Sequence, residues 1–91
     1  MTYTFTDAQE MHRKHPDTFG IPGAIDIAMI KPGSHVKICA NDRERFWVKV
    51  TSRDGINMTG TIDNDLIFVD EHGLDYGDTV SFQTRHIYQV E

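Results

Sequence analysis

Apolar and polar residues alternate through much of this chain with the period of two that is typical of half-buried β-strands. Residues 45–52 show the pattern most clearly, because Phe46, Val48 and Val50 fall on one face. Residues 35–40 alternate in the same way. The opposite faces carry His35, Lys37 and Cys39 on the first segment and Arg45, Trp47, Lys49 and Thr51 on the second. We therefore expect two strands, each with one face in a core.

Turn residues divide the sequence that follows into further short elements. Asp54 and Gly55 predict a tight hairpin that leads to a third strand at 56–62. Gly60 lies inside that strand and predicts a bulge or a sharp bend, which a small barrel needs in order to close. The elements expected after it are a short apolar segment at 66–69, an acidic loop at 70–73 and strands at 79–83 and 87–90.

The N-terminal part predicts a short helix. Thr6 followed by Gln9 has the form of a capping box with Thr6 as the N-cap. The helix is expected over residues 7–15 and should end before Pro16, because proline disfavours a helical conformation in the residue before it.

Residues 24–30 fit two interpretations. Ile25, Ile27 and Met29 alternate as they would in a strand. The spacing of Ile27 and Ile30 suits a helical turn equally well. The sequence supports both.

These elements predict a mainly β fold with a minor α+β character. With 91 residues the chain has room for one hydrophobic core. We expect a single domain over residues 1–91, with the helix at 7–15 and a β-barrel at 33–91. Five or six short antiparallel strands with one capping helix are typical of an SH3-like or similarly compact barrel.

Charge is distributed unevenly along the chain, whose net charge is −5. Residues 31–53 hold six Lys and Arg against two Asp and Glu, a net charge of +4, which leaves −9 for the rest. The overall sign disfavours non-specific binding to DNA. A local basic face on an acidic body fits a charged partner.

The sequence contains no recognisable targeting segment and only one cysteine. No stretch approaches the roughly 18 apolar residues of a membrane span, and the N-terminus lacks the basic and apolar regions of a signal peptide. We expect a soluble, cytoplasmic protein with no membrane partner. The single cysteine, Cys39, excludes an intrachain disulfide and is expected to be a small apolar strand residue.

Motifs for catalysis or metal binding are absent from the sequence. His12 and His15 are spaced i, i+3, but no HExxH motif or paired cysteines accompany them. The paired carboxylates lie in predicted turns, where aspartates usually set backbone geometry: Asp63 with Asp65, Asp70 with Glu71 and Asp75 with Asp78. We therefore assign no catalytic residue, no metal and no cofactor, and expect a protein that is not an enzyme.

The outward face of the central strands is the candidate binding surface. An aromatic side chain among cations can stack on a base or anchor a protein contact. The candidate residues for a partner or ligand are Trp47, Lys49, Arg45, Lys37, Arg85 and Tyr88. The alternative is that Trp47 packs under the N-terminal helix, against Met11 and Phe19, as a second small core.

Several blocks of sequence between about residues 15 and 90 carry a resemblance to a known family. They are His15-Pro16-Asp17-Thr18-Phe19, Gly33-Ser34-His35-Val36-Lys37, Arg45-Phe46-Trp47-Val48-Lys49-Val50, Gly60-Thr61-Ile62-Asp63-Asn64, Tyr76-Gly77-Asp78-Thr79-Val80-Ser81-Phe82 and His86-Ile87. In order and spacing they resemble the bacterial family called domain of unknown function 2314. Members often carry Asn-x-Pro where this chain has Asn64-Asp65-Leu66. The resemblance implies a small bacterial or bacteriophage protein and brings no established activity.

Three functions are consistent with these observations. The leading hypothesis is a non-catalytic binding module that docks onto a partner protein, which in a bacterial or phage setting would be a host regulatory or defence protein. The alternative is binding of a nucleotide, a short RNA or another anionic small molecule through the Trp47 and Lys49 face. A small enzyme is the third. A homodimer could form through unpaired edge strands, with residues 66–69 near an edge.

Overall fold

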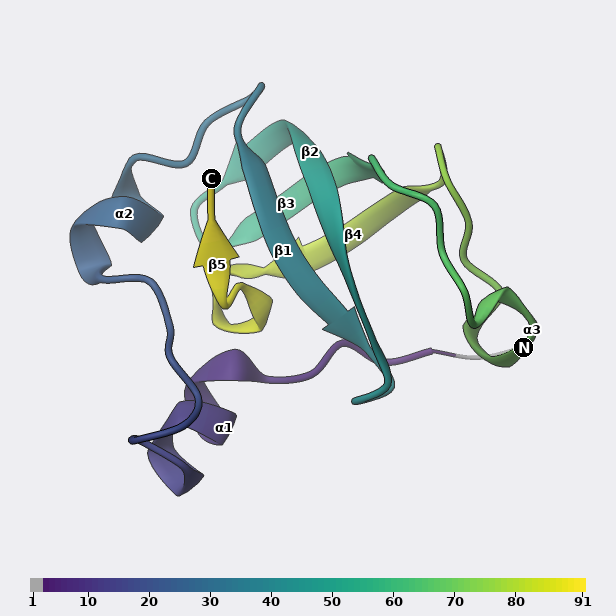
Figure 1. The fold of residues 1–91 in the computed structure, drawn as a ribbon. Coiled ribbons are helices and arrows are strands. Elements are labelled where there is room, and N and C mark those ends of the chain that lie inside the picture. The colour runs from purple at the N-terminus through teal and green to yellow at the C-terminus, as the bar shows by residue number, and fades with distance from the viewer. Residues whose placement is uncertain (1–2) are drawn as a thin grey trace.

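One antiparallel sheet of five strands forms the body of the protein in the computed structural model, which describes residues 3–91 (Figure 1). The strands are β1 (His35–Ala40), β2 (Glu44–Asp54), β3 (Asn57–Ile62), β4 (Thr79–Gln83) and β5 (Gln89–Val90). Their order across the sheet is β4-β3-β2-β1-β5. This arrangement confirms the predicted mainly β, antiparallel, barrel-like fold.

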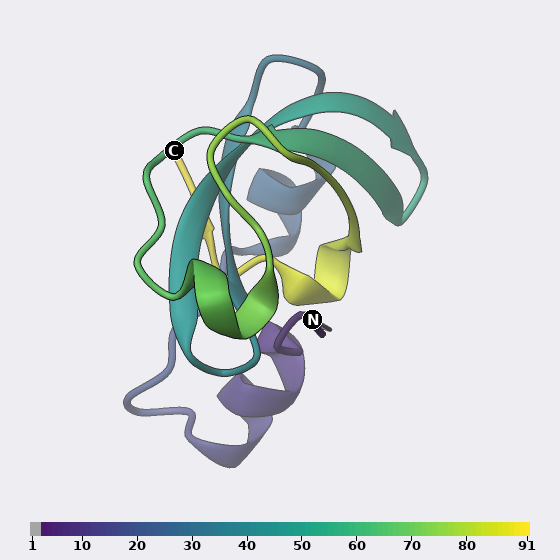
Figure 2. The same cartoon turned by 90° about the vertical axis from the view of Figure 1, so that its right-hand side faces the viewer.

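Three short helices and one 3₁₀ turn surround the sheet. They are α1 (Ala8–Lys14), α2 (Ala24–Ala28), α3 (Val69–His72) and η1 (Thr84–His86). α1 lies below the sheet, and α2 and α3 lie on opposite sides of the molecule (Figures 1 and 2). None of the helices within residues 3–91 is long and apolar enough to cross a membrane.

The alternating residues of the strands form the core, as their pattern predicts. Val36 and Ile38 from β1 pack with Phe46, Val48 and Val50 from β2, and all five are at most 1% exposed. β3 and β4 add Met58, Ile62, Val80 and Phe82, and Ile30, Leu74 and Ile87 complete the cluster from outside the sheet.

The bulge predicted from Gly60 is present beside that residue, but it lies in the neighbouring strand β2 rather than in β3. Val50 pairs with Gly60 but Ser52 pairs with Thr59, so Thr51 is the extra residue of a β-bulge in β2. Figure 2 shows β2 and β3 arching together at this end of the sheet. The bend lets a five-stranded sheet enclose its own core.

The N-cap of α1 differs from the predicted one. Asp7, not Thr6, caps the helix, because Asp7 Oδ1 accepts a hydrogen bond of 2.9 Å from Glu10 N–H. Thr6 is used elsewhere: its N–H donates to the carbonyl of Cys39, and its hydroxyl bonds to Asp42. The N-terminal segment thereby pairs with the end of β1.

Two predictions for the C-terminal half were wrong in detail. Residues 69–72, expected as the end of an apolar segment and the start of an acidic loop, form α3, with His72 only 1% exposed. The last strand is shorter than the expected 87–90. Thr84–His86 form η1 after β4, so pairing with β1 resumes only at Gln89.

The ambiguous segment 24–30 forms α2 followed by a turn. Arg53 at the far end of β2 explains the helical outcome. Its Nη1 donates to the carbonyl oxygens of Ile27 at 2.7 Å and Ile30 at 2.9 Å. The Ile27 carbonyl also accepts from Ile30 N–H at 3.3 Å, so Arg53 adds a second donor at the end of the helix and one donor to the turn after it.

Candidate binding surface

Strand pairing places the outward residues of β1 and β2 in three cross-strand rows. Arg45 lies opposite Cys39, Trp47 opposite Lys37, and Lys49 opposite His35. We call these six residues the outer β1–β2 face. Because residues opposite each other in an antiparallel pair have Cβ atoms about 5 Å apart, each row brings two side chains together. The register of one hairpin therefore brings together four of the six predicted site residues, Lys37, Arg45, Trp47 and Lys49.

Trp47 occupies the middle row beside Lys37. The Lys37 ammonium lies 5.4 Å from the centroid of the Trp47 ring, which is within the range of a cation–π contact. The loop after β3 lies along the backbone of Trp47. The N–H of Trp47 donates to Asn64 Oδ1 at 2.6 Å, and the carbonyl of Trp47 accepts from Asp63 N–H at 2.9 Å. The side chain is left half-buried.

The N-terminal helix lies at the Arg45 end of this face. Met11 and Phe19, which the alternative interpretation placed against Trp47, line a cavity together with Cys39 and Arg45. Trp47 is not among the residues that line it. This helix and the loop after it therefore cover Cys39, which is 8% exposed.

Arg45 lies over two aromatic rings. Its guanidinium carbon is 4.8 Å from the ring centroid of Tyr88 and 5.6 Å from that of Phe19. The two rings lie 5.8 Å apart. His12 Nδ1 donates to the carbonyl of Phe19 at 2.6 Å and so attaches the Phe19 loop to α1. These contacts hold the guanidinium without neutralising its charge.

The hydroxyl of Tyr88 is buried and has no hydrogen-bond partner among residues 3–91. Burial raises the pKa of Tyr88 above its ordinary value, although the nearby Arg45 charge acts to lower it. Tyr88 therefore stays neutral and acts here as a ring surface for Arg45.

The cations of the outer β1–β2 face differ from most others in the chain. Lys37, Arg45 and Lys49 make no ion pair with any residue of the range 3–91. By contrast, ion pairs join Arg13 to Glu10, Arg43 to Glu71 and Arg85 to Asp7. None of the three cations on the outer β1–β2 face is therefore paired with a carboxylate of residues 3–91.

Arg85 does not belong to this surface. It lies in η1, where Nη1 is 3.2 Å from Asp7 Oδ2 and Nε donates to Gln83 at 2.8 Å. Its partner Asp7 is the N-cap of α1. The structure brings together the other five predicted site residues and assigns Arg85 to the junction between η1 and α1.

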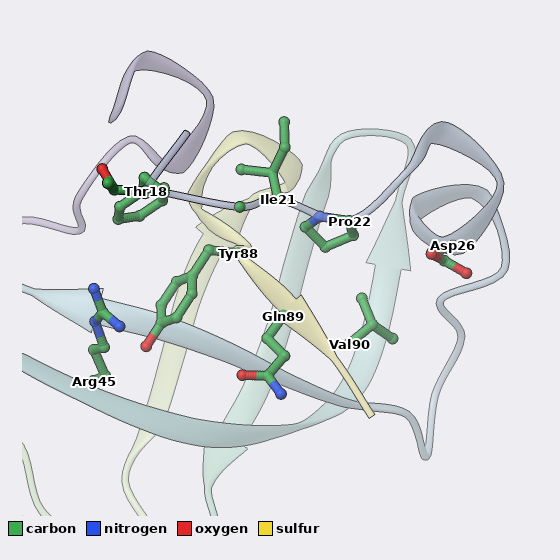
Figure 3. Close-up of a pocket in the computed structure, with 10 residues that line it drawn as sticks. Thr18, Ile21, Pro22, Asp26, Arg45, Tyr88, Gln89 and Val90 are labelled. Carbon is green, nitrogen blue, oxygen red and sulfur yellow. The ribbon is translucent and has the colours of Figure 1, made fainter. Parts of the chain in front are cut away.

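Two cavities adjoin Arg45 and Phe19. The first, of about 390 Å³, lies between the loop before α2 and the last strand. Figure 3 shows Arg45 and Tyr88 at one end of it and Asp26 at the other, with Ile21 and Pro22 on the loop side. The second, of about 370 Å³, lies between α1, the β1–β2 hairpin and the segment before α3.

A buried carboxylate–histidine pair was missed by the sequence analysis. Glu44 is 7% exposed, and its Oε1 accepts from His72 Nε2 at 2.9 Å. His72 Nδ1 accepts from Leu74 N–H at 3.0 Å, so the ring proton resides on Nε2. Glu44 also accepts from the N–H groups of Ile67 and Phe68 at 2.7 and 2.8 Å.

These hydrogen bonds set the charge state of Glu44 and show what the pair does. Burial alone raises the pKa of Glu44, but the hydrogen bonds from His72, Phe68 and Ile67 outweigh it and hold the pKa below its ordinary value. Because both side chains are enclosed and their polar atoms are bonded within the protein, the pair is structural. No sequence signal marks it, since Glu44 and His72 are 28 positions apart and neither lies in a motif.

Metal-ligating residues do not gather in the described part of the chain. Among residues 3–91, no group of three or more His, Cys, Asp or Glu side chains is arranged to hold a metal ion. His35 is bonded instead to Asp63, with 2.9 Å between Nε2 and Oδ2. Cys39 is a free, buried thiol.

No protein-family model, curated protein or solved structure matches this chain. The resemblance to domain of unknown function 2314 therefore stays a prediction.

Proposed function

We propose that this protein is a non-catalytic binding module that docks an acidic segment of a partner protein on the outer β1–β2 face. The observation that carries the proposal is the set of three cations, Lys37, Arg45 and Lys49, that surround Trp47 without an internal carboxylate partner. Complementary charge steers association and fixes the register of a bound segment. A tryptophan beside such cations supplies an apolar anchor.

A protein segment suits this face better than a long nucleic acid. Carboxylates flank the cations: Asp63 is bonded to His35, Asp42 lies in the β1–β2 hairpin, and Glu71 lies near it beside Arg43. A continuous polyanion would meet these groups and the net acidic remainder of the chain. A short segment with a few acidic side chains can meet the cations alone.

The alternative function is binding of a nucleotide, a short RNA or another small anion. It is favoured by the arrangement of Arg45 over Tyr88 and Phe19 beside a cavity of about 390 Å³. A guanidinium held against aromatic rings can pair with a phosphate or carboxylate at the cavity mouth.

The proposed setting follows from the family resemblance. In a bacterial or phage cytoplasm, a host regulatory or defence protein would be the target. Identification of the captured partner tests this part of the proposal.

Charge reversal at a single lysine tests the proposal. Lys49 and Lys31 are both exposed and neither makes an ion pair with residues 3–91, but only Lys49 lies on the outer β1–β2 face. The tagged chain and the variants Lys49→Glu and Lys31→Glu are used to capture partners from bacterial lysate. We expect one protein to be retained by the wild type and Lys31→Glu and lost by Lys49→Glu.

The eluates also distinguish the proposed protein partner from the alternative, a small anionic ligand. Each is denatured and analysed for proteins and for small molecules in parallel. A nucleotide or oligonucleotide that elutes without a protein would favour the alternative function. Equal capture by the two lysine variants would contradict the assignment of the outer β1–β2 face.

A further inference from the structure

An apolar cavity continues the outer β1–β2 face at its Arg45 end. Its lining includes Met11 from α1, Phe19 from the following loop, and Ile67 and Phe68 from the segment before α3. We call it the hairpin cavity, because the β1–β2 hairpin closes one side. Its volume of about 370 Å³ is within the range of sites that hold a ligand group.

The lining of the hairpin cavity combines apolar surface with charges of both signs, because Asp42 and Glu44 line it together with Arg43 and Arg45. Ile67 is 81% exposed there, the largest exposed fraction among the large apolar side chains of residues 3–91. The Arg43 guanidinium lies 4.2 Å from the ring centroid of Phe68, and Arg45 lies over Phe19 on the other side. Arg43 is paired with Glu71, so Arg45 is the arginine whose charge is free.

The two lysines and the cavity occupy successive rows of the β1–β2 pair, with Lys49 on β2 and Lys37 on β1. Successive outward rows on a strand are two residues apart, a distance of about 6.6–6.8 Å. The row of Lys49 is followed by the row of Lys37 and Trp47, and then by the row of Arg45, which lines the cavity. Alternate side chains of an extended segment have the same spacing, so such a segment can meet the three rows in turn.

We propose that the partner segment carries two acidic residues and one large apolar residue at alternate positions. The acidic side chains lie against Lys49 and Lys37, and the apolar side chain enters the hairpin cavity beside Arg45. This inference rests on the proposed function and adds to it the sequence pattern of the partner. Apolar contact in the cavity supplies affinity, and the lysines supply orientation.

Synthetic peptides provide the probe. The first is an extended peptide with two glutamates and a tryptophan at alternate positions, separated by serines. The second replaces tryptophan with alanine, and the third has the composition of the first in scrambled order. Binding to the 91-residue chain is measured by fluorescence polarisation, and the contacted residues are mapped by amide chemical shifts. We expect the first peptide to bind at least about tenfold more tightly than the other two.

Variants of the chain show whether the tryptophan occupies the hairpin cavity. Met11→Gln and Ile67→Asn make the cavity polar. Met29→Gln and Ile25→Asn are matched controls, because these side chains are 72% and 76% exposed on or next to α2 and line none of the cavities described above. We expect the first pair to weaken binding of the tryptophan peptide at least about tenfold and the controls to leave it unchanged. Amide spectra confirm that each variant is folded.

The outcomes separate this inference from the proposed function. If Lys49→Glu weakens binding but the tryptophan and alanine peptides bind equally, the anchor is wrong and the proposed function stands. If cavity variants and controls behave alike, the hairpin cavity is not the site. If no acidic peptide binds, both the inference and the proposed protein partner are overturned. The same holds if a short oligonucleotide binds instead and its binding is lost in the Lys49→Glu variant.

Discussion

Gly60 is the residue at which the close approach of two strands excludes any side chain. A Cβ built on it would lie 2.6 Å from the carbonyl oxygen of Lys49 and 2.5 Å from a methyl group of Val48. Neither neighbour can move freely, because Val48 is fully buried and the Lys49 carbonyl is part of the backbone of β2. The tight bend of the sheet therefore depends on glycine here.

Gly60→Ala should destabilise the fold for this reason. We expect a loss of about 1–3 kcal/mol in the free energy of unfolding, the cost of forcing extra volume into a close-packed site. Urea unfolding followed by tryptophan fluorescence measures it. Gly20→Ala is the control, because a Cβ at that position meets nothing within 4 Å. A Gly60 variant as stable as the control would show that the bend has room for a methyl group.

At the scale of elements, α2 shows how a remote side chain decides local structure. Ile25 and Met29, which supply two of the three alternating apolar positions, are exposed, while Ile30 is buried in the core. The alternation of apolar residues in this segment therefore does not mark a β-strand. Arg53 satisfies the carbonyls of Ile27 and Ile30 from another part of the chain, and a short helix forms where a strand was equally compatible with the sequence.

Arg53→Met should release α2 from the sheet. The change keeps the apolar stem and removes three hydrogen bonds, two to the carbonyls of Ile27 and Ile30 and one to that of Gly55, so we expect a cost of about 1–3 kcal/mol, felt first at α2. The amides of Ile27 and Met29, which are bonded within the helix, report it by faster hydrogen exchange. Arg13→Met is the control, because the Arg13 guanidinium only pairs with Glu10 on an exposed helix face. Equal exchange in both variants would show that the hydrogen bonds from Arg53 do not stabilise α2.

At the scale of the whole molecule, Glu44 joins segments that are far apart in the chain. It begins β2, and its carboxylate holds the backbone of Ile67 and Phe68 and the ring of His72. The long connection between β3 and β4 is thereby fixed against the turn end of the β1–β2 hairpin. This connection also supplies Ile67 and Phe68 to the hairpin cavity, so the shape of the proposed site depends on the same carboxylate.

The Glu44 carboxylate should make stability depend on pH. Its pKa in the folded protein lies below the ordinary value of 4.5, so it stabilises the fold when ionised. This contribution is complete above about pH 4.5 and is lost as the pH falls through the lower pKa of the folded state. Glu44→Gln should therefore cost about 1–3 kcal/mol at neutral pH, and the difference from wild type should shrink in acid.

Urea unfolding at a series of pH values measures this difference. Glu71→Gln makes the same chemical change on an exposed side chain whose partner, Arg43, is also exposed, and should have little effect. A Glu44→Gln deficit that stays constant into acid would show that the hydrogen bonds, rather than the charge, stabilise the connection.

The sequence alone was sufficient for features that depend on near neighbours. Alternation with a period of two identified which faces of 35–40 and 45–52 enter the core, because the side chains of a strand point to opposite sides at successive residues. Asp54 and Gly55 marked the hairpin, and Gly60 marked the bend. The same alternation grouped Lys37, Arg45, Trp47 and Lys49, since the register of one hairpin brings them together.

Only the tertiary structure decided the features that join distant segments. The contact between Arg53 and α2, the Glu44–His72 pair and the capture of Arg85 by Asp7 each link residues between 23 and 78 positions apart. Their geometry follows from how the sheet curls and where the loops return, which short-range spacing does not encode. The hairpin cavity has the same origin: Met11, Phe19 and Ile67 meet only after α1 and the segment before α3 have packed around the β1–β2 hairpin.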